Sequence, residues 1–216
     1  MLWTLVVPLK PLAVAKSRLA AGAGRLPGPA LALAFALDTV RAALACGSVR
    51  DVAVVTADPL AGAEVAALGA RVLPEPAGDG GLNAALAHGA RSVRAHRPHS
   101  PVATLNADLP ALRPAELGRV LDSAAEFPRA FLADAAGIGT TLLAAAPGME
   151  LAPAFEGRSR ARHSASGAWE IGLEDVDSVR RDVDTESDLR AALELGVGAH
   201  TAAVAAGVPI PWRAAD

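Results

Sequence analysis

Apolar residues along this chain fall into short continuous runs, and the runs alternate with longer segments in which apolar residues recur at helical spacing. The runs are rich in Val, Leu and Ala and end near Pro, Gly or Asp, which is typical of strands buried on both faces of a sheet. The predicted strands are 2–7, 51–56, 70–73, 101–106, 130–133 and 142–145. The predicted helices are 29–45, 59–68, 82–95 and 114–126, a short one ending at Gly167, and one that begins within 182–189 and runs to Leu195.

The alternation of strand and helix predicts an α/β fold with a mostly parallel central sheet, right-handed crossovers and helices on both faces. Strand 2–7 is almost wholly apolar, so we expect it to be the innermost strand. Thr185 and Asp188 have the spacing of a capping box at the start of the last helix. Residues 171–181 and the tail from about residue 197 show little periodicity. Without internal repeats or a long linker, residues 1–216 are predicted to form one domain.

Composition narrows the class of protein. Hydrophobic residues make up 52% of the chain but aromatic residues only 3%, so the core must be built mostly from Ala, Leu and Val. The single Cys46 lies in an apolar helical pattern and is predicted to be a buried thiol. A formal net charge of −3 and a pI near 6.0 do not provide the basic face that nucleic acid or a membrane surface requires. No apolar run approaches the ~20 residues that span a bilayer. We therefore expect a cytoplasmic protein with neither nucleic acid nor membrane as a partner.

The loop after strand 2–7 concentrates positive charge. It contributes Lys10, Lys16, Arg18 and Arg25, and no Asp or Glu occurs from the start of the chain to Leu37. The carboxyl end of an inner strand is where open α/β sheets bind ligands, and cations there can neutralise phosphate oxygens. The loop contains neither G-x-G-x-x-G nor G-x-x-x-x-G-K-[ST], so it is neither a dinucleotide fingerprint nor a P-loop. A solvated basic loop is the alternative interpretation.

Two aspartates are candidates for holding a metal ion. Asp108 directly follows strand 101–106, and Asp184 precedes the last helix. A carboxylate pair of this kind can hold Mg²⁺ with few protein ligands while substrate phosphates supply the rest. The alternatives are that Asp184 is a helix cap and that Asp108 is a turn residue before Pro110.

The third quarter of the chain carries amides, hydroxyls and guanidinium groups, the donors that a phosphate or carboxylate ligand needs. These come from Gly137, Gly139, Thr140, Thr141, Arg158, Ser159, Arg160 and Arg162. A solvated helix face is the alternative interpretation of the arginines. His88 and His163 have no metal-binding partner at useful spacing, which favours surface or supporting roles. No arrangement of Ser, Cys, His and Asp indicates a protein nucleophile.

Five segments, taken together and in order, resemble one family. They are Val7 to Lys10 with Lys16 to Leu19, Gly80 to Leu86, Asn106 to Leu112, Asp134 with Gly137 to Thr141, and Val183 to Leu189. From Leu5 to about Leu195 the chain is similar to the 2-phospho-L-lactate / phosphoenolpyruvate guanylyltransferase family of coenzyme F420 biosynthesis. The resemblance implies a single-domain, Rossmann-like nucleotidyltransferase. It also implies transfer of GMP from GTP to phosphoenolpyruvate, which gives enolpyruvoyl-diphospho-guanosine and pyrophosphate. The next transferase of the pathway would use the enolpyruvoyl-diphospho-guanosine.

The resemblance implies roles for particular residues as well. Leu9, Lys10, Lys16, Ser17 and Arg18 would contact the triphosphate of GTP, and Gly80, Gly81 and Asn83 the guanosine. Asp108 and Asp184 would hold Mg²⁺ and, with Lys16, act in catalysis. Thr140 and Ser159 fall on positions that bind the phosphoacid. The family commonly has Phe-Gly-x-x-Ser where this chain has Phe155-Glu156-Gly157-Arg158-Ser159, so either Glu156 or Gly157 would offer its amide to the acceptor.

Other activities stay open at the level of the sequence. The acceptor could instead be 2-phospho-L-lactate or 3-phosphoglycerate. A molybdenum-cofactor guanylyltransferase or sugar-phosphate nucleotidyltransferase typically has a Gly-Gly loop where this chain has Leu9-Lys10-Pro11. A glycosyltransferase with an Asp-x-Asp motif is disfavoured by Asn106, and a non-catalytic nucleotide-binding module by the presence of both aspartates and both basic segments.

Overall fold

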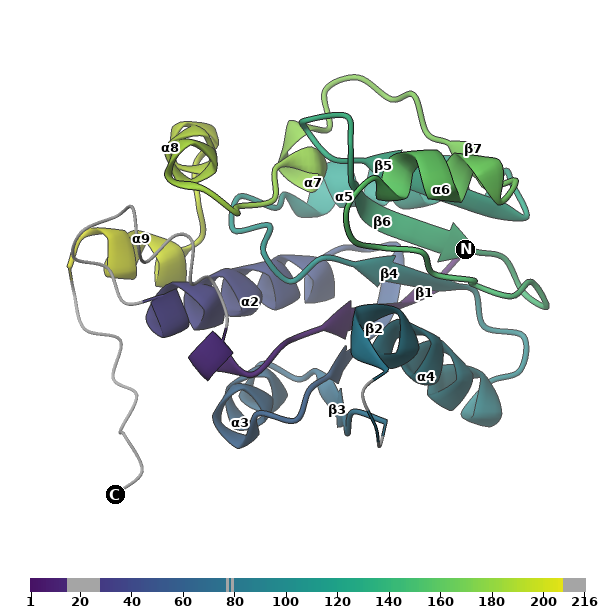
Figure 1. Ribbon diagram of the computed structural model, residues 1–216, viewed down its shortest axis with the longest axis horizontal. Coiled ribbons are helices and arrows are strands. Elements are labelled where there is room, and N and C mark those ends of the chain that lie inside the picture. Colours follow the sequence, from purple (N-terminus) through teal and green to yellow (C-terminus); the bar gives the residue numbers. More distant parts are fainter. Residues whose placement is uncertain (15–27, 77, 79, 208–216) are drawn as a thin grey trace.

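The computed structural model describes residues 1–14, 28–76, 78 and 80–207, and within these ranges seven strands form one sheet (Figure 1). The order across the sheet is β3-β2-β1-β4-β6-β5-β7. The strands are β1 (Trp3–Pro8), β2 (Val49–Val55), β3 (Arg71–Leu73), β4 (Val102–Leu105), β5 (Arg129–Ala133), β6 (Thr140–Ala145) and β7 (Trp169–Glu170).

Most neighbouring strands run parallel, as predicted. β1 pairs in parallel with β2 and β4, β2 with β3, and β5 with β7. β6 is the exception, because it runs antiparallel to both β4 and β5. The connection from β5 to β6 is too short for a crossover helix, so the chain turns back as a hairpin. β1 is an inner strand, but the prediction that it is the innermost one is wrong, because β4 occupies the middle of the order.

The helical elements separate the strands along the chain. They are η1 (Leu12–Val14), α2 (Gly28–Leu44), α3 (Pro59–Ala67), α4 (Gly81–His96), α5 (Pro114–Ala124), α6 (Ser159–Ala165), α7 (Asp177–Arg180), α8 (Glu186–Leu195) and α9 (Ala199–Ala205). The predicted capping box is confirmed, since Thr185 Oγ1 accepts from the Asp188 amide at 3.3 Å and Asp188 Oδ2 accepts from the Thr185 amide at 2.9 Å.

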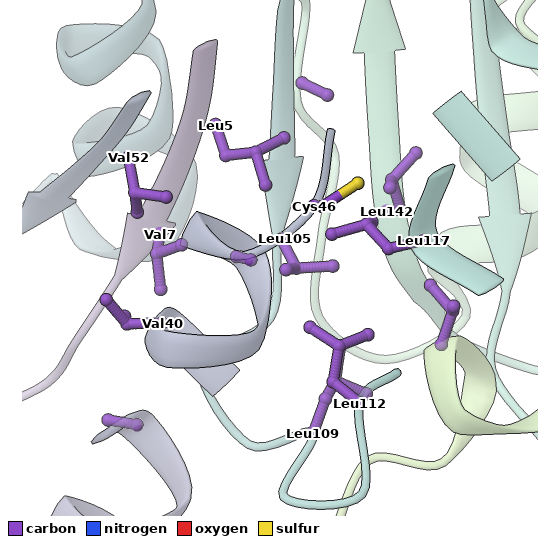
Figure 2. Packing of buried hydrophobic residues seen from close by; sticks show 14 of the residues in the cluster. Leu5, Val7, Val40, Cys46, Val52, Leu105, Leu109, Leu112, Leu117 and Leu142 are labelled. Carbon is purple, nitrogen blue, oxygen red and sulfur yellow. The ribbon is translucent and has the colours of Figure 1, made fainter. Parts of the chain in front are cut away.

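Two apolar layers bury the faces of the sheet. On one face, α2, α3, α5 and α7 cover alternate strand residues such as Leu5, Val7 and Leu105, part of which Figure 2 shows. On the other face, α4 packs on the intervening residues, including Val6 and Val55. Cys46 belongs to the first layer, and burial raises the pKa of its thiol, in agreement with the predicted inert role.

The outer side of α2 carries a third apolar layer formed with α8 and α9. Asp38 on α2 holds α9 in place, because its carboxylate accepts from the amides of His200 at 3.1 Å and Thr201 at 2.8 Å. The sequence did not indicate α9, whose alanine-rich segment gives no contrast of polar and apolar faces. It also missed β7, which has two residues, and α7, which has four, because elements this short are too short to show a repeating pattern. None of the helices in the described ranges has the length and apolar content to cross a membrane.

Candidate active site

A cavity of about 570 Å³ opens at the edge of the sheet where β1, β4 and β5 end. Because β6 is antiparallel, its first residue, Thr140, reaches the same edge. The cavity is lined by Pro8, Leu9, Lys10, Ala32, Leu82, Asn106, Ala107, Asp108, Asp134, Gly139, Thr140, Phe155, Glu156, Gly157, Ser159, Asp182 and Asp184. The location agrees with the rule that ligands of open α/β sheets bind beyond the carboxyl ends of the strands.

The structure brings most of the predicted site residues to this cavity. Those that line it are Leu9, Lys10, Asp108, Gly139, Thr140, Glu156, Gly157, Ser159 and Asp184. Gly80, Gly81 and Asn83 flank Leu82 at the start of α4 but do not line the cavity themselves. The predicted roles of Lys16, Ser17 and Arg18 concern positions outside the described residues.

The two candidate metal ligands are joined through the backbone. The Val183 amide donates to the carbonyl oxygen of Asp108 at 3.1 Å. Val183 is fully buried in the layer between α2 and α8, while its two neighbours, Asp182 and Asp184, line the cavity. The alternative interpretation of Asp184 as a helix cap is wrong, because Thr185 is the N-cap of α8.

Two further carboxylates line the cavity: Asp134, which begins one of the five family segments but was given no role, and Asp182, which the sequence analysis did not single out. Burial, and then the negative charges of Asp108, Asp184 and Asp134, raise the pKa of Asp182 to about 8. The signal that could have found Asp182 is its Asp-x-Asp spacing with Asp184, which we took as the beginning of a helix.

These carboxylates suit a hard cation. Asp108, Asp182 and Asp184 all line this wall of the cavity, and a divalent cation bound there would offset their negative charge. No group of three or more Cys, His, Asp or Glu in the described part of the chain is arranged as a complete metal site. The carboxylates of Asp108 and Asp184 are a donor set of the kind that commonly holds Mg²⁺ together with substrate phosphates and water.

Another part of the cavity wall begins with a turn folded around Asp134, whose charge also acts on Asp182. The Asp134 carboxylate accepts from the amides of Ile138 at 2.9 Å and Gly139 at 2.8 Å. A β-carbon at Gly139 would lie 2.4 Å from Asp134 Oδ2, so any other residue there would displace the carboxylate that holds the turn. The turn delivers Thr140 to the cavity as a buried hydroxyl.

His163 on α6 lies directly behind Thr140. Its Nδ1 is 2.9 Å from Thr140 Oγ1, and its Nε2 accepts from the Ala154 amide at 3.0 Å. The ring is fully buried against Phe131 and Phe155. Burial, and then the positive charges of Arg129 and Arg162, lower the pKa of His163 to about 4.

The loop 155–157 completes this wall. Asn83 holds it by two hydrogen bonds, since the Phe155 amide donates to Asn83 Oδ1 at 2.7 Å and Asn83 Nδ2 donates to the Phe155 carbonyl at 3.3 Å. Glu156 and Gly157 both have positive φ, at 78° and 51°. In the described part of the chain neither of their amides donates to a protein acceptor. Glu156 also lies 3.9 Å from Lys10 Nζ, as an exposed ion pair between two sides of the cavity.

Two of the arginines on α6 have structural partners. Arg160 pairs with Glu170 at 3.0 Å and donates to the Gly137 carbonyl at 2.9 Å, and Arg162 donates to the Phe155 carbonyl at 3.1 Å. Neither lines the cavity. Arg160 therefore supports the turn at Gly137, and Arg162 supports the loop at Phe155. The alternative interpretation, in which these arginines only form a solvated helix face, does not account for these contacts.

The fold and the cavity define a nucleotidyltransferase of the MobA-like NTP transferase class, whose family profile matches residues 31–170. Solved structures agree on the fold. A nucleotidyl transferase from Methanothermobacter superposes with a TM-score of 0.67 at 22% identity, covering 90% of this chain and 97% of that one. A CMP:2-keto-3-deoxy-manno-octonic acid synthetase complexed with CTP gives 0.55 at 16% identity, covering 90% and 98%. The predicted Rossmann-like nucleotidyltransferase fold is thus confirmed.

Closer relatives define the family. The chain is 70% identical to a phosphoenolpyruvate guanylyltransferase of Streptomyces avermitilis, with all of both chains covered. It is 71% identical to the protein of that name in Streptomyces coelicolor, covering 95% of this chain and 97% of the relative. With the one in Thermomonospora curvata the identity is 61%, covering 96% and 90%. The chain belongs to the phosphoenolpyruvate guanylyltransferase family, as its five motifs indicated.

Proposed function

We propose that this protein transfers GMP from GTP to phosphoenolpyruvate, giving enolpyruvoyl-diphospho-guanosine and pyrophosphate. The observation that carries the proposal is the division of one cavity into two walls. Asp108, Asp182 and Asp184 form a carboxylate wall, and the hydroxyls of Thr140 and Ser159 with the amides of Glu156 and Gly157 form what we call the neutral wall. The relatives named for this reaction match 95% or more of the chain.

The neutral wall suits an acceptor with a phosphate and a carboxylate. Thr140 and Ser159 offer hydroxyl groups, and Glu156 and Gly157 offer amides that have no other acceptor in the described part of the chain. Consecutive residues with unusual backbone angles often present their amides to anions in this way. Because both amides are available, we assign acceptor binding at this family position to Glu156 and Gly157 together rather than to one of them.

The carboxylate wall suits Mg²⁺. Asp108 and Asp184 would hold the ion, which when bound neutralises phosphate oxygens and polarises the phosphorus under attack. Lys10, at the mouth of the cavity, adds positive charge beside the triphosphate, and we assign the same role to Lys16 and Arg18 from the family motif alone.

The chemistry needs alignment and charge neutralisation more than proton transfer. A phosphate oxygen of phosphoenolpyruvate attacks the α-phosphorus of GTP and forms the new P–O bond. The bond from the α-phosphorus to the bridging oxygen breaks, and pyrophosphate leaves with the electron pair. The attacking oxygen is already ionised at neutral pH, so no general base is required. The product is an activated diphosphate, which fits a role as donor for the next transferase of coenzyme F420 biosynthesis.

Release of pyrophosphate tests the proposal directly. The protein is incubated with GTP and Mg²⁺ and, in separate reactions, with phosphoenolpyruvate, 2-phospho-L-lactate or 3-phosphoglycerate. We expect turnover with phosphoenolpyruvate to exceed that with the other two acceptors, and to require GTP rather than CTP or ATP. Adding chelator should stop the reaction. Absence of pyrophosphate with all three acceptors would rule out the function, and preference for 2-phospho-L-lactate would correct the acceptor.

A further inference from the structure

One imidazole, that of His163, lies behind the neutral wall and contacts both of its loops. On one side it meets Thr140, which begins β6, and on the other it meets the amide of Ala154, which leads into the loop 155–157. The ring has no exposed surface, so it cannot itself touch a substrate. Its effect on the site must act through the groups that it holds.

The hydrogen bonds define which nitrogen carries the proton. A backbone N–H can only donate, so the Ala154 amide requires a lone pair on Nε2. A neutral imidazole has one N–H, which must then be on Nδ1. Because Thr140 Oγ1 is 2.9 Å from Nδ1, this N–H donates to the hydroxyl oxygen. Thr140 therefore receives a hydrogen bond from behind, and its own O–H proton must be directed elsewhere.

We propose that His163 is a positioning residue that keeps the Thr140 hydroxyl as a donor pointing into the cavity, toward an anionic oxygen of the acceptor substrate. A threonine hydroxyl can accept or donate, and without a fixed donor behind it the O–H would be free to rotate away. The inference rests on the proposed function in one respect, namely that the anion is the phosphoacid.

The surroundings of the ring keep it in this state. The charged neighbours whose fields it feels are Arg129 and Arg162, and both disfavour a second proton. Phe131 and Phe155 enclose the ring, with centroids 5.7 Å and 4.9 Å away. A protonated imidazole would lose the Ala154 hydrogen bond, because Nε2 would become a donor facing a donor.

The tautomer can be measured without any substrate. Long-range ¹H–¹⁵N correlation spectra of the five histidines distinguish Nδ1–H from Nε2–H rings, and the spectrum of His163→Gln assigns the resonance that disappears. We expect His163 to be the Nδ1–H form and to stay so from pH 5 to pH 8. An Nε2–H tautomer, or titration near the ordinary histidine value, would overturn the inference whatever the protein catalyses.

Two substitutions separate the two hydrogen bonds of the ring. His163→Gln can place an acceptor near the position of Nε2 and removes the donor to Thr140, whereas His163→Asn can place a donor near Nδ1 and removes the acceptor for Ala154. We expect His163→Gln to raise the KM for phosphoenolpyruvate about 3–10-fold, the change expected from the loss of one hydrogen bond, with the KM for GTP unchanged. The exposed His96, substituted by Gln, is the matched control.

The decisive comparison repeats these variants in a Thr140→Val background. If His163 acts through Thr140, the effect of His163→Gln on the KM for phosphoenolpyruvate falls below about twofold there, while that of His163→Asn persists. Equal effects of His163→Gln in both backgrounds would contradict the proposal. Failure of the wild-type protein to use phosphoenolpyruvate would instead reject the proposed function, and the tautomer measurement would still decide the state of the ring. If a variant does not fold, the tautomer measurement on the wild-type protein still tests the proposed role of His163.

Discussion

The Val183 amide donates to the carbonyl oxygen of Asp108, and this one hydrogen bond joins the end of β4 to the segment before α8. Successive residues of an extended segment point to opposite sides. Val183 is buried beneath the cavity, so Asp182 and Asp184 on either side of it face the cavity. The buried Val183 thereby holds Asp184 at the same wall of the cavity as Asp108, although the two aspartates come from distant parts of the chain.

Asp108→Asn and Asp184→Asn should each abolish most turnover and leave the fold intact. Each amide is close in size to the carboxylate but loses the charge that would hold Mg²⁺, so kcat should fall by roughly 10²-fold or more. Steady-state pyrophosphate release and the thermal midpoint measure the two properties. The control is Asp175→Asn, because Asp175 lies outside the cavity and asparagine tolerates its φ of 56°. If either site variant turned over at the wild-type rate, the aspartate replaced in it would not be a ligand of Mg²⁺.

His163 should make the protein less stable in mild acid. Its pKa is lowered from 6.5 to about 4 in the folded state, so below pH 6.5 the unfolded chain binds a proton that the folded chain does not. The stabilisation is therefore complete above pH 6.5 and is lost as the pH falls toward 4. Between pH 7 and pH 5 the loss amounts to about 2 kcal/mol. Asp182, whose pKa is raised to about 8, contributes with the opposite sign over this pH range, so the test is the difference between the wild type and His163→Gln in urea unfolding at both pH values, which should change by that amount. An equal loss in the two proteins would contradict it.

The parallel half of the fold could be predicted because its signals are local. β1, β2 and β4 are apolar runs bounded by loop residues, and the helices between them show helical periodicity, as at Leu86 and Val93 on α4. The antiparallel β6 was predicted as a strand, but its direction depends on a hairpin whose turn is shaped by the Asp134 carboxylate. That interaction exists only in the folded chain.

The site was predictable where a residue follows a strand directly. Asp108 is the example, since the end of β4 fixes its place at the edge of the sheet, whereas Thr140, the first residue of β6, was assigned from the family resemblance. Asp182 and His163 could not be assigned in this way. The shifted pKa of each depends on burial and on charges brought from other elements, which no spacing along the sequence reports.

Glu156→Gly should stabilise the protein slightly. Glu156 has a φ of 78°, a conformation that costs a non-glycine residue about 1–2 kcal/mol, whereas glycine adopts it without this cost but loses more chain entropy on folding. The exposed ion pair with Lys10 contributes little. We expect a net gain of roughly 0.5–1 kcal/mol in the free energy of unfolding, measured by urea denaturation. Glu156→Ala, which keeps the unfavourable conformation and also removes the ion pair, is the control and should show no gain.

Gly89→Ala should destabilise the protein although alanine favours helices. Gly89 lies where α4 packs closely on β1 and β2, and a β-carbon there would lie 2.5 Å from Val6 Cγ1 and 2.9 Å from Val55 Cγ2. Both valines are fully buried and have stiff side chains, so the helix must move outward. Overpacking of this kind costs about 1–3 kcal/mol, which exceeds the ~1 kcal/mol gained in helix propensity.

A second helical glycine gives the matched control for this prediction. A β-carbon at Gly118 on α5 would lie 3.7 Å from Cys46 Sγ, an ordinary contact distance. Gly118→Ala should therefore realise the propensity gain and raise the free energy of unfolding by roughly 0.5–1 kcal/mol. Because both changes add one methyl group to a helix, opposite signs in urea denaturation would show that packing against Val6 and Val55 decides the outcome at Gly89. Stabilisation by both substitutions would mean that α4 can shift without cost, and the close packing of this helix on β1 would then not limit the sequence.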